Sequence, residues 1–223
     1  MELERLLNIR PGVTALIGGG GKTTLLDALG EELSKKGSVI LCTTTHLYPP
    51  DHLPCLSEPT EAEVQAALTR APLVCVGGRT ENGKFTAPPI PMARLAELAR
   101  YVIVEADGAR GRPLKAHAAH EPVIPPEANQ TILVIGASGL GKPVCEAVHR
   151  PELFCAALGI SPEDAVTPER EAAFVEREAL HDRVLINQAD TEQTKAQARR
   201  LAELLRGPVC IGALQKGELE CWQ

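Results

Sequence analysis

Four consecutive glycines run directly into a lysine and two threonines in the segment Gly18–Thr24, which reads GGGGKTT. An apolar run from Val13 precedes this segment, and an amphipathic stretch, Lys22–Lys36, follows it. Glycines let a backbone approach a ligand closely, and a helix N-terminus offers free N–H groups and a favourable dipole to phosphate. The pattern therefore predicts a nucleoside triphosphate site. Its expected ligands are the backbone of Gly18, Gly19, Gly20 and Gly21, the Lys22 ammonium on the β- and γ-phosphates, the Thr23 hydroxyl on Mg²⁺, and Thr24 on the α-phosphate.

The glycine loop is shorter than the common patterns GxxxxGKS and GxxxxGKT, whose first glycine would fall on Leu16 inside the expected strand. It matches the compact form GxxGKTT, which also occurs in Mur-type ligases. A second segment, Gly136–Lys142, fits GxxxxGK, but Pro143 follows it and offers neither a hydroxyl for Mg²⁺ nor an N–H for phosphate. We interpret the second segment as a turn. A contact between Lys142 and an anionic substrate is the alternative.

Two carboxylates follow the apolar run that begins at Tyr101. Glu105 ends this run, and Asp107 comes two residues later. A phosphate-loop site needs an acidic residue at the end of a neighbouring strand to hold Mg²⁺, and carboxylate oxygens suit that ion. We expect Glu105 to be a metal ligand and both carboxylates to take part in catalysis in the same cleft. A solvated strand end is the alternative.

Positive charge gathers after these carboxylates in the sequence ARGRPLK. Arg110 is expected to stabilise charge on a transferred phosphoryl group, and Arg112 and Lys115 to bind an anionic substrate. The segment TTTH ends another apolar run, and from it we expect Thr45 and His46 to reach the substrate. The alternatives are a solvated loop for the basic segment and a structural hydrogen bond for His46.

The segment NQAD, which follows a later apolar run, resembles the NKxD element of guanine-nucleotide proteins. In that element an aspartate accepts hydrogen bonds from the guanine base. We therefore assign Asn187 and Asp190 to the nucleotide, with GTP favoured over ATP. Asn and Asp also favour helix N-termini, so a helix cap is the alternative.

Short apolar runs alternate with amphipathic stretches along the whole chain. Near-continuous hydrophobicity is typical of parallel strands that are buried on both faces, and the alternation predicts helices between them. We expect one domain over residues 1–223, an α/β fold of the P-loop NTPase type. It has three layers and a doubly wound, mostly parallel sheet of about seven strands. The expected strands begin near Val13, Ser38, Leu73, Tyr101, Thr131, Arg183 and Pro208, and the expected helices are Lys22–Lys36, Thr60–Arg70, Ala93–Arg100, Glu152–Leu158, Pro168–Leu180 and Thr191–Arg206. The Asn-Gly step in the segment Arg79–Phe85 predicts a hairpin or flap.

The composition narrows the set of partners. The formal net charge is −6, with no run of like charges, which argues against a nucleic-acid surface. No segment has the length and apolar character of a membrane span or a signal peptide, so we expect a cytoplasmic protein without a membrane partner. The seven cysteines include no CxxC pair and are most simply buried small hydrophobes. A zinc site built from Cys55, Cys145 or Cys155 with a histidine is the alternative.

Several segments together resemble the YqeC family of selenium-dependent hydroxylase accessory proteins. They are GGGGKTT, TTTH, the segment VEADGARGRPLKAHAAHEPVIP from Val104, GLGKP, VHRPE from Val148, and LINQAD. The resemblance covers nearly the whole chain. It implies a small P-loop NTPase-like protein that assists the maturation of selenium-dependent molybdenum hydroxylases. It also supports the roles given to Gly18–Thr24, Glu105, Asp107, Arg110, Arg112 and Lys115.

Two functions remain open at this point. The first is a Mg²⁺-dependent NTPase or phosphoryl-transfer factor, with Lys22, Glu105, Asp107 and Arg110 as its catalytic residues. Its partners would be GTP or ATP and a molybdenum hydroxylase or its cofactor intermediate. The second is a non-hydrolysing, nucleotide-switched chaperone for cofactor insertion.

Overall fold

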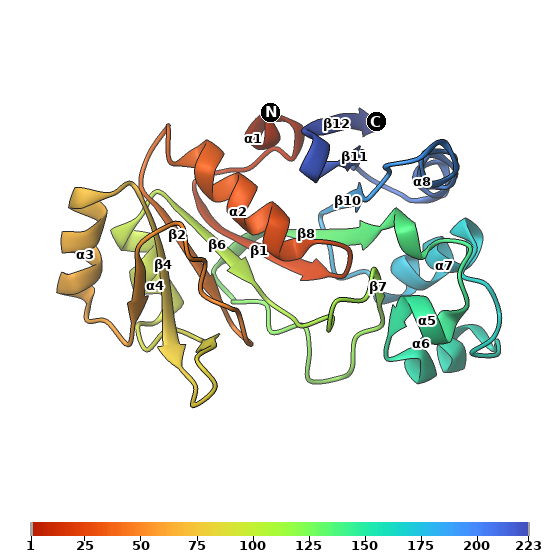
Figure 1. The fold of residues 1–223 in the computed structure, drawn as a ribbon, viewed down its shortest axis with the longest axis horizontal. Helices are drawn as coiled ribbons and strands as arrows, with labels where there is room; N and C mark the ends of the chain where they lie inside the picture. Colours follow the sequence, from red (N-terminus) through yellow and green to blue (C-terminus); the bar gives the residue numbers. More distant parts are fainter. Residues whose placement is uncertain (1, 223) are drawn as a thin grey trace.

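A mostly parallel β-sheet forms the centre of the computed structural model, which describes residues 2–222 (Figure 1). The strand order is β12-β11-β10-β8-β1-β6-β2-β4-β3, and β5 also pairs with β4. Only the pairs β11–β12 and β4–β5 are antiparallel. The strands are β1 (Gly12–Gly18), β2 (Val39–Thr43), β3 (Cys55–Ser57), β4 (Leu73–Arg79), β5 (Phe85–Thr86), β6 (Tyr101–Glu105), β8 (Ala128–Gly136), β10 (Arg183–Asn187), β11 (Val209–Ala213) and β12 (Glu218–Trp222).

Helices cover both faces of this sheet. Apolar residues of α1 and α2 pack on one face, and those of α3 to α8 pack on the other. Strand β1 shows how the faces separate, because Leu16 packs toward α2 whereas Ala15 and Ile17 pack toward the opposite layer. The predicted three-layer, doubly wound α/β fold is therefore confirmed. The helices are α1 (Leu3–Leu6), α2 (Lys22–Leu33), α3 (Glu61–Arg70), α4 (Met92–Leu98), α5 (Val144–Ala147), α6 (Pro151–Leu158), α7 (Pro168–Glu178) and α8 (Glu192–Leu204).

The seven predicted strands are all present, as β1, β2, β4, β6, β8, β10 and β11. The sheet has ten strands, however, so the predicted number of about seven was too low. The additional strands β3 and β5 have three and two residues, which is too short to produce a periodic signal. Strand β12 reads ELECW and is mostly exposed, so it has no continuous apolar run. Strand β3 pairs with β4 on the other side of α3 in the sequence, whereas β5 and β12 each form a hairpin with the strand before them.

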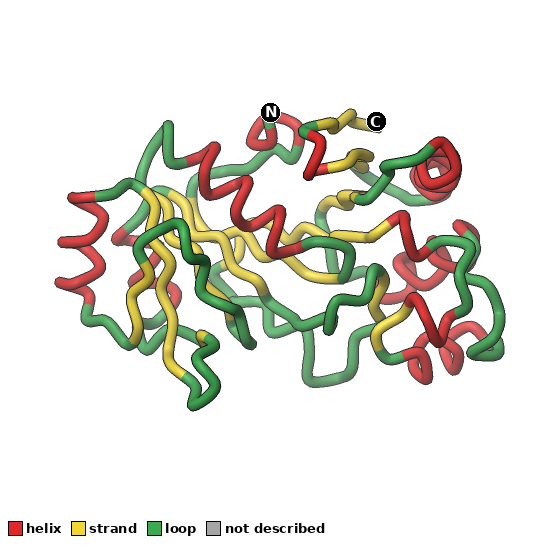
Figure 2. The backbone as a smooth tube through the Cα atoms, viewed as in Figure 1, coloured by secondary structure: helices red, strands yellow, loops and turns green. Residues whose placement is uncertain are grey.

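The predicted hairpin near Arg79 is also present. It connects β4 to β5, and the Thr80 amide donates to the Lys84 carbonyl at 3.0 Å. A separate two-stranded ladder joins β7 (Leu114–Lys115) to β9 (Val148–His149), near the carboxyl edge of the sheet. Figure 2 shows how much of the chain near this edge is loop.

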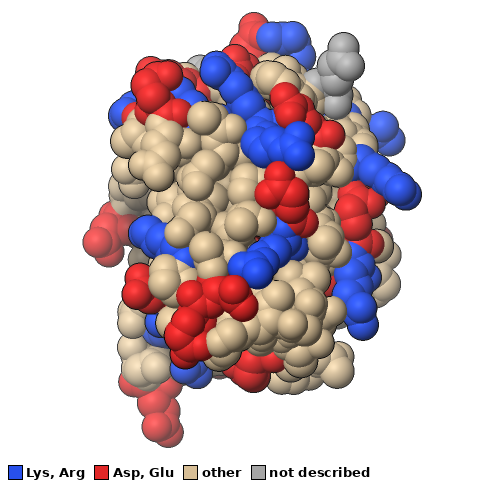
Figure 3. All heavy atoms as spheres, turned by 90° about the vertical axis from the view of Figure 1, so that its right-hand side faces the viewer, with Lys and Arg blue, Asp and Glu red and all other residues tan. Residues whose placement is uncertain are grey.

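The outer face over α7 and α8 carries intermingled acidic and basic side chains (Figure 3). Ion pairs such as Arg200–Glu169, at 2.9 Å, join the two helices there. Exposed pairs of this kind contribute little to stability. Within residues 2–222, no helix combines the length and the apolar character that spanning a bilayer requires.

Candidate functional site

The glycine loop connects the end of β1 to the start of α2. Gly18, Gly20 and Gly21 have φ values of +96°, +66° and +112°, a region that side chains other than glycine rarely adopt. Packing imposes the same choice of residue. A Cβ atom at Gly19 would lie 2.5 Å from the Pro113 carbonyl oxygen, and one at Gly20 would lie 2.2 Å from the Gly136 amide nitrogen. The run of glycines is thus required by both backbone conformation and close approach.

The N-terminus of α2 is left without a cap. Threonine side chains cap α3, α7 and α8, whereas α2 begins after Gly21 with no side-chain hydrogen bond. The amides of Gly18, Gly19 and Gly20 donate to protein oxygens, but within residues 2–222 the amides of 21–24 have no acceptor. Free N–H groups in the first turn of a helix, together with its dipole, form an anion site.

Lys22 is folded back onto the loop. Its Nζ atom donates to the Gly18 carbonyl oxygen at 2.5 Å and lies 2.9 Å from Oδ1 of Asp107. Both side chains are buried, with exposed fractions of 5% for Lys22 and 0% for Asp107. The lysine is therefore already charge-paired, so a phosphate ligand has to compete with Asp107 for it.

Asp107 lies at the centre of a buried cluster of cations. In addition to Lys22, Lys115 Nζ lies 3.3 Å and His117 Nε2 lies 2.7 Å from Oδ2, and the Gly18 amide donates to Oδ2 at 2.8 Å. Burial disfavours the charged carboxylate, but the His117 hydrogen bond and the two lysine charges outweigh it and hold the pKa of Asp107 well below its usual value. Sequence reasoning placed Asp107 in the cleft, but the structure places it beneath the loop. There it positions Lys22, and the three cations around it offset the cost of removing the carboxylate from water.

Lys115 also lies away from the cleft surface. Its side chain is fully buried between Asp107 and Glu121, whose Oε1 is 3.0 Å from Nζ. Burial, with the nearby Lys22 charge, lowers the pKa of Lys115 to about 8. We had expected Lys115 to bind substrate directly. The structure instead places it below the cleft lining, in the buried cluster around Asp107.

Glu105 and Thr23 meet at the mouth of the loop. Strand pairing aligns Glu105 with Leu16 on one side and Thr43 on the other. The Thr23 hydroxyl donates to Glu105 Oε2 at 3.0 Å. Burial raises the pKa of Glu105, against the Lys22 charge and the Thr23 hydrogen bond, which lower it. A hydroxyl and a carboxylate side by side are hard oxygen donors of the kind that Mg²⁺ prefers, so these residues fit the predicted metal site.

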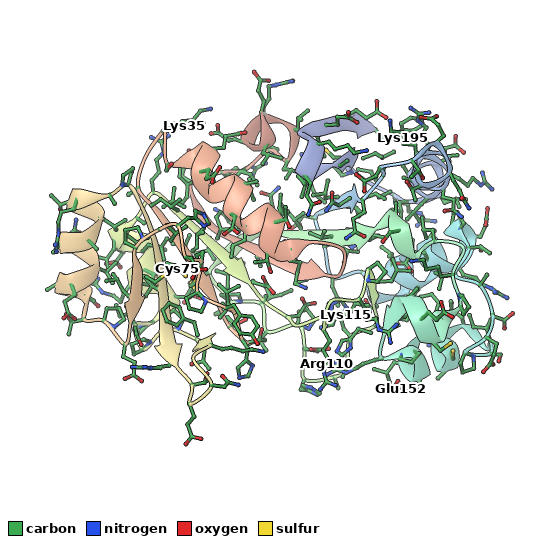
Figure 4. All side chains as sticks on the ribbon, viewed as in Figure 1. Lys35, Cys75, Arg110, Lys115, Glu152 and Lys195 are labelled. Atoms are coloured by element: carbon green, nitrogen blue, oxygen red, sulfur yellow. The ribbon has the colours of Figure 1, made fainter. Side chains whose placement is uncertain are left out.

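The loop opens into a cleft of about 1130 Å³. Many of the residues that the sequence predicted to bind nucleotide, metal or substrate line this cleft. They are Gly19–Thr23, Thr45, His46, Glu105, Arg110 and Arg112. Arg110 is exposed and has no hydrogen-bond or ion-pair partner within residues 2–222. Figure 4 shows Arg110 and Lys115 on the segment that follows β6, at the lower edge of the sheet in this view. The structure thus brings the phosphate loop, the TTTH segment and the basic segment together.

Asn187 connects the phosphate loop to the backbone after β11 through two hydrogen bonds. Its Nδ2 atom donates to the Gly20 carbonyl at 2.8 Å, and its Oδ1 atom accepts from the Leu214 amide at 3.0 Å. Asp190 is exposed, lies outside the cleft lining, and has its Oδ1 atom 3.8 Å from Lys216 Nζ. The helix-cap alternative for both residues is wrong, since Thr191 caps α8. Base recognition by Asp190 stays a prediction.

The second glycine segment does not form a phosphate loop. Ala137–Gly139 forms the short 3₁₀ turn η1, and Lys142 is exposed outside the cleft lining. No group of three or more His, Cys, Asp or Glu side chains in residues 2–222 is arranged to hold a metal ion.

Sequence reasoning missed several residues at the basic end of the cleft. His120, Glu121, His149 and Arg150 line it, and His117 connects it to α7 through Glu178. Glu121 begins the segment EPVIP, and His117 and His120 lie just before it. His149 and Arg150 belong to VHRPE. No local pattern indicates a role for them, because they meet through the ladder between β7 and β9.

Glu171 on α7 provides a pH-dependent test of the buried network. Burial and the Glu178 charge raise its pKa to about 8 from an unfolded-state value near 4.5. Between these values the folded protein retains a proton that the unfolded chain has lost. Stability is therefore expected to fall as pH rises, by about 1.4 kcal/mol per pH unit from this group. Urea unfolding of Glu171→Gln at pH 5 to 8 should lose that slope, and Glu169→Gln, an exposed change on α7, should keep it. Equal slopes in wild type and Glu171→Gln would contradict the assignment.

Three comparisons with known proteins complete the description of the site. A family model described as YqeC protein matches residues 14–152. The Escherichia coli (strain K12) protein named "Uncharacterized protein YqeC" is 36% identical over 162 residues, which cover 69% of this chain and 63% of that protein. The chain thus spans somewhat less than two thirds of its relative's length. A crystal structure of the signal recognition particle 54 kDa protein from Aeropyrum pernix K1 in complex with GDP aligns with a TM-score of 0.41 and 15% identity, over 96% of this chain and 44% of that one.

Proposed function

The chain belongs to the YqeC protein family, and we propose that it binds a nucleoside triphosphate with Mg²⁺ at the N-terminus of α2. The observation that carries this proposal is the uncapped first turn beside the Lys22 ammonium, where the amides of 21–24 have no acceptor among residues 2–222. Several converging N–H groups and one lysine are what a β-phosphate requires.

Different residues of the site bind the phosphates and the metal ion. The backbone of 21–24 binds the phosphates, and Lys22 turns from Asp107 toward the β- and γ-phosphates. Thr23 and Glu105 hold Mg²⁺, which when bound neutralises charge on the phosphate oxygens. Arg110, which lies in the cleft wall and has no partner in the described part of the chain, stabilises the charge that develops on the γ-phosphoryl group.

We propose hydrolysis or phosphoryl transfer as the reaction of this site, in the service of maturing selenium-dependent molybdenum hydroxylases. This assignment of pathway rests on the family resemblance in the sequence. A different observation favours a nucleotide-driven switch. A chain of polar contacts runs from Lys22 through Asp107 and His117 to Glu178 on α7. A movement of Lys22 would change these contacts and, through them, the position of α7.

Titration with fluorescent GTP and ATP, with Mg²⁺ or with EDTA, tests nucleotide binding. We expect micromolar or tighter binding that needs Mg²⁺, with GTP preferred. Tighter or equal ATP binding would remove the guanine assignment, and no binding of either nucleotide would overturn the proposal. Single-turnover hydrolysis, with and without a molybdenum hydroxylase, separates the enzyme from the switch, because a switch shows negligible turnover in both conditions.

The metal assignment predicts that Thr23→Val reduces the Mg²⁺-dependent gain in nucleotide affinity by about tenfold, or ~1.4 kcal/mol. The substitution keeps the size of the side chain and removes the hydroxyl. Thr23 is exposed, so folding should be unaffected. The matched control is Thr69→Val on the exposed face of α3. An unchanged Mg²⁺ dependence in Thr23→Val would show that this hydroxyl is not a ligand.

A further inference from the structure

The cleft is somewhat larger than a typical single-ligand site. Its volume of about 1130 Å³ exceeds the range of roughly 300–1,000 Å³ that is typical of single-ligand sites. The phosphate loop forms only one part of its wall. Another part consists of the segment 108–112, the segment 120–123, and the pair His149 and Arg150.

This second part of the wall is strongly basic. Arg110, Arg112, His120, His149 and Arg150 all line it, and Glu121 is the carboxylate among them. Glu121 is already shared, because it forms ion pairs with both Arg150 and the buried Lys115. Arg112 donates to the Glu146 carbonyl, which carries no net charge. The cluster therefore keeps an excess of positive charge in a chain whose formal net charge is −6.

A short β-ladder brings the residues of this basic cluster together. The ladder between β7 and β9 pairs Lys115 with His149, and the Ala116 amide donates to the His149 carbonyl at 3.0 Å. Arg150 Nη2 then lies 3.4 Å from His120 Nε2. Burial, followed by the charges of Lys115 and Arg110, lowers the pKa of His149. The Lys115 and Arg110 charges therefore disfavour a further positive charge in this part of the cleft, whereas an anion there would be favoured.

Backbone strain accompanies the cluster. Arg110 and Arg150 have φ values of +48° and +66°, which place two non-glycine residues in the left-handed region. Each costs free energy, and such residues concentrate at ligand sites where the surrounding structure enforces them. Both arginines line the same cleft.

We infer that this basic end of the cleft is a second subsite, for a substrate that carries a phosphate or an equally charged oxyanion. His149, Arg150 and Arg112 contact the anion, and the buried Lys115 adds its charge from below. The guanidinium groups can pair with two oxygens of a tetrahedral anion, which a single ammonium cannot do. The inference rests on the proposed function in one respect, namely that the nucleotide occupies the other end.

The two ends share a buried floor. Lys115 and Lys22 contact the two oxygens of the same Asp107 carboxylate, at 3.3 Å and 2.9 Å. An anion beside His149 therefore lies near the phosphate end of the bound nucleotide and away from its base. This arrangement suits a small phosphorylated substrate that is held next to the triphosphate.

Calorimetric titration of inorganic phosphate into the protein tests the subsite, with and without a saturating non-hydrolysable GTP analogue and Mg²⁺. We expect phosphate to bind in both conditions. Arg150→Gln and Arg112→Gln should each weaken phosphate binding by about tenfold or more, because each removes a charge-assisted contact. Affinity for the nucleotide should change less than about twofold, which is below ~0.5 kcal/mol. Arg70→Gln, an exposed change on α3, is the matched control.

The remaining outcomes separate the two proposals. Unchanged phosphate affinity in Arg112→Gln, which is exposed and cannot unfold the protein, would overturn the subsite. Displacement of phosphate by the nucleotide, with parallel loss of both affinities in the variants, would also overturn it, since the arginines would then belong to the nucleotide site. If the protein binds no nucleotide but still binds phosphate through Arg150 and Arg112, the subsite stands and the proposed function fails.

Discussion

Replacing Lys22 with alanine is expected to weaken nucleoside triphosphate binding by about a hundredfold or more, or ~2.7 kcal/mol. The Lys22 ammonium group is the cation that the loop would bring to the β- and γ-phosphates, and contacts of this type are charge-assisted. Folding should be little affected, because Asp107 keeps Lys115 and His117 as partners after the change. Fluorescent-nucleotide titration gives the affinity, and circular dichroism confirms the fold.

The chain offers a matched control for this experiment. Lys142 ends the other glycine segment, but it is exposed and lies outside the cleft. Lys142→Ala should therefore bind nucleotide with wild-type affinity. Unchanged affinity in Lys22→Ala, or an equal loss in both variants, would show that the loop is not the phosphate site.

Replacing Asp107 with asparagine is expected to destabilise the protein by about 3–5 kcal/mol, because it leaves buried cations without their anion. Asparagine has nearly the same shape as aspartate, so the loss of stability measures the effect of removing the negative charge. Lys22, Lys115 and His117 would then face one another across a site from which water is excluded. Urea unfolding measures the effect. Asp51→Asn, an exposed change in a loop, should alter stability by less than about 0.5 kcal/mol.

A second substitution separates the electrostatic cost from a loss of packing. If repulsion among cations is the cause, Asp107→Asn combined with Lys115→Met should recover part of the lost stability, since one buried charge has been removed. A loss below about 1 kcal/mol in Asp107→Asn would contradict the charge cluster. No recovery in the double variant would indicate that the Gly18 amide contact to Asp107 dominates instead.

The cluster around Asp107 also bears on how the site works. In the structure, Lys22 is held by Asp107 and by the Gly18 carbonyl, so the loop is stable without a ligand. A triphosphate adds negative charge that competes for the same ammonium. Asp107 would then lose part of its contact with Lys22 and depend more on its hydrogen bond to His117, which also contacts Glu178 of α7. We expect these side chains to couple nucleotide binding to the position of α7, whether or not hydrolysis follows.

The sequence by itself determined the order of the main elements and the phosphate loop. Strands such as β1 and β10 are recognisable because burial on both faces demands a continuous apolar run. The loop Gly18–Thr24 is recognisable because positive φ values and close packing permit only glycine there. Glu105 followed from its place at a strand end. These features depend on local periodicity and local backbone geometry, which a single segment reveals.

Only the tertiary structure decided the roles of the charged residues. Asp107 turns inward because Lys22 of the loop and the neighbouring Lys115 and His117 surround it, and Asn187 reaches Gly20 across 167 residues of chain. His149 and Arg150 join the basic segment through the ladder between β7 and β9. Burial and ionic partners depend on which strands lie side by side, and sequence spacing does not encode that. The three-residue strand β3 is defined by the same kind of pairing, because it lies beside β4 on the other side of α3 in the sequence.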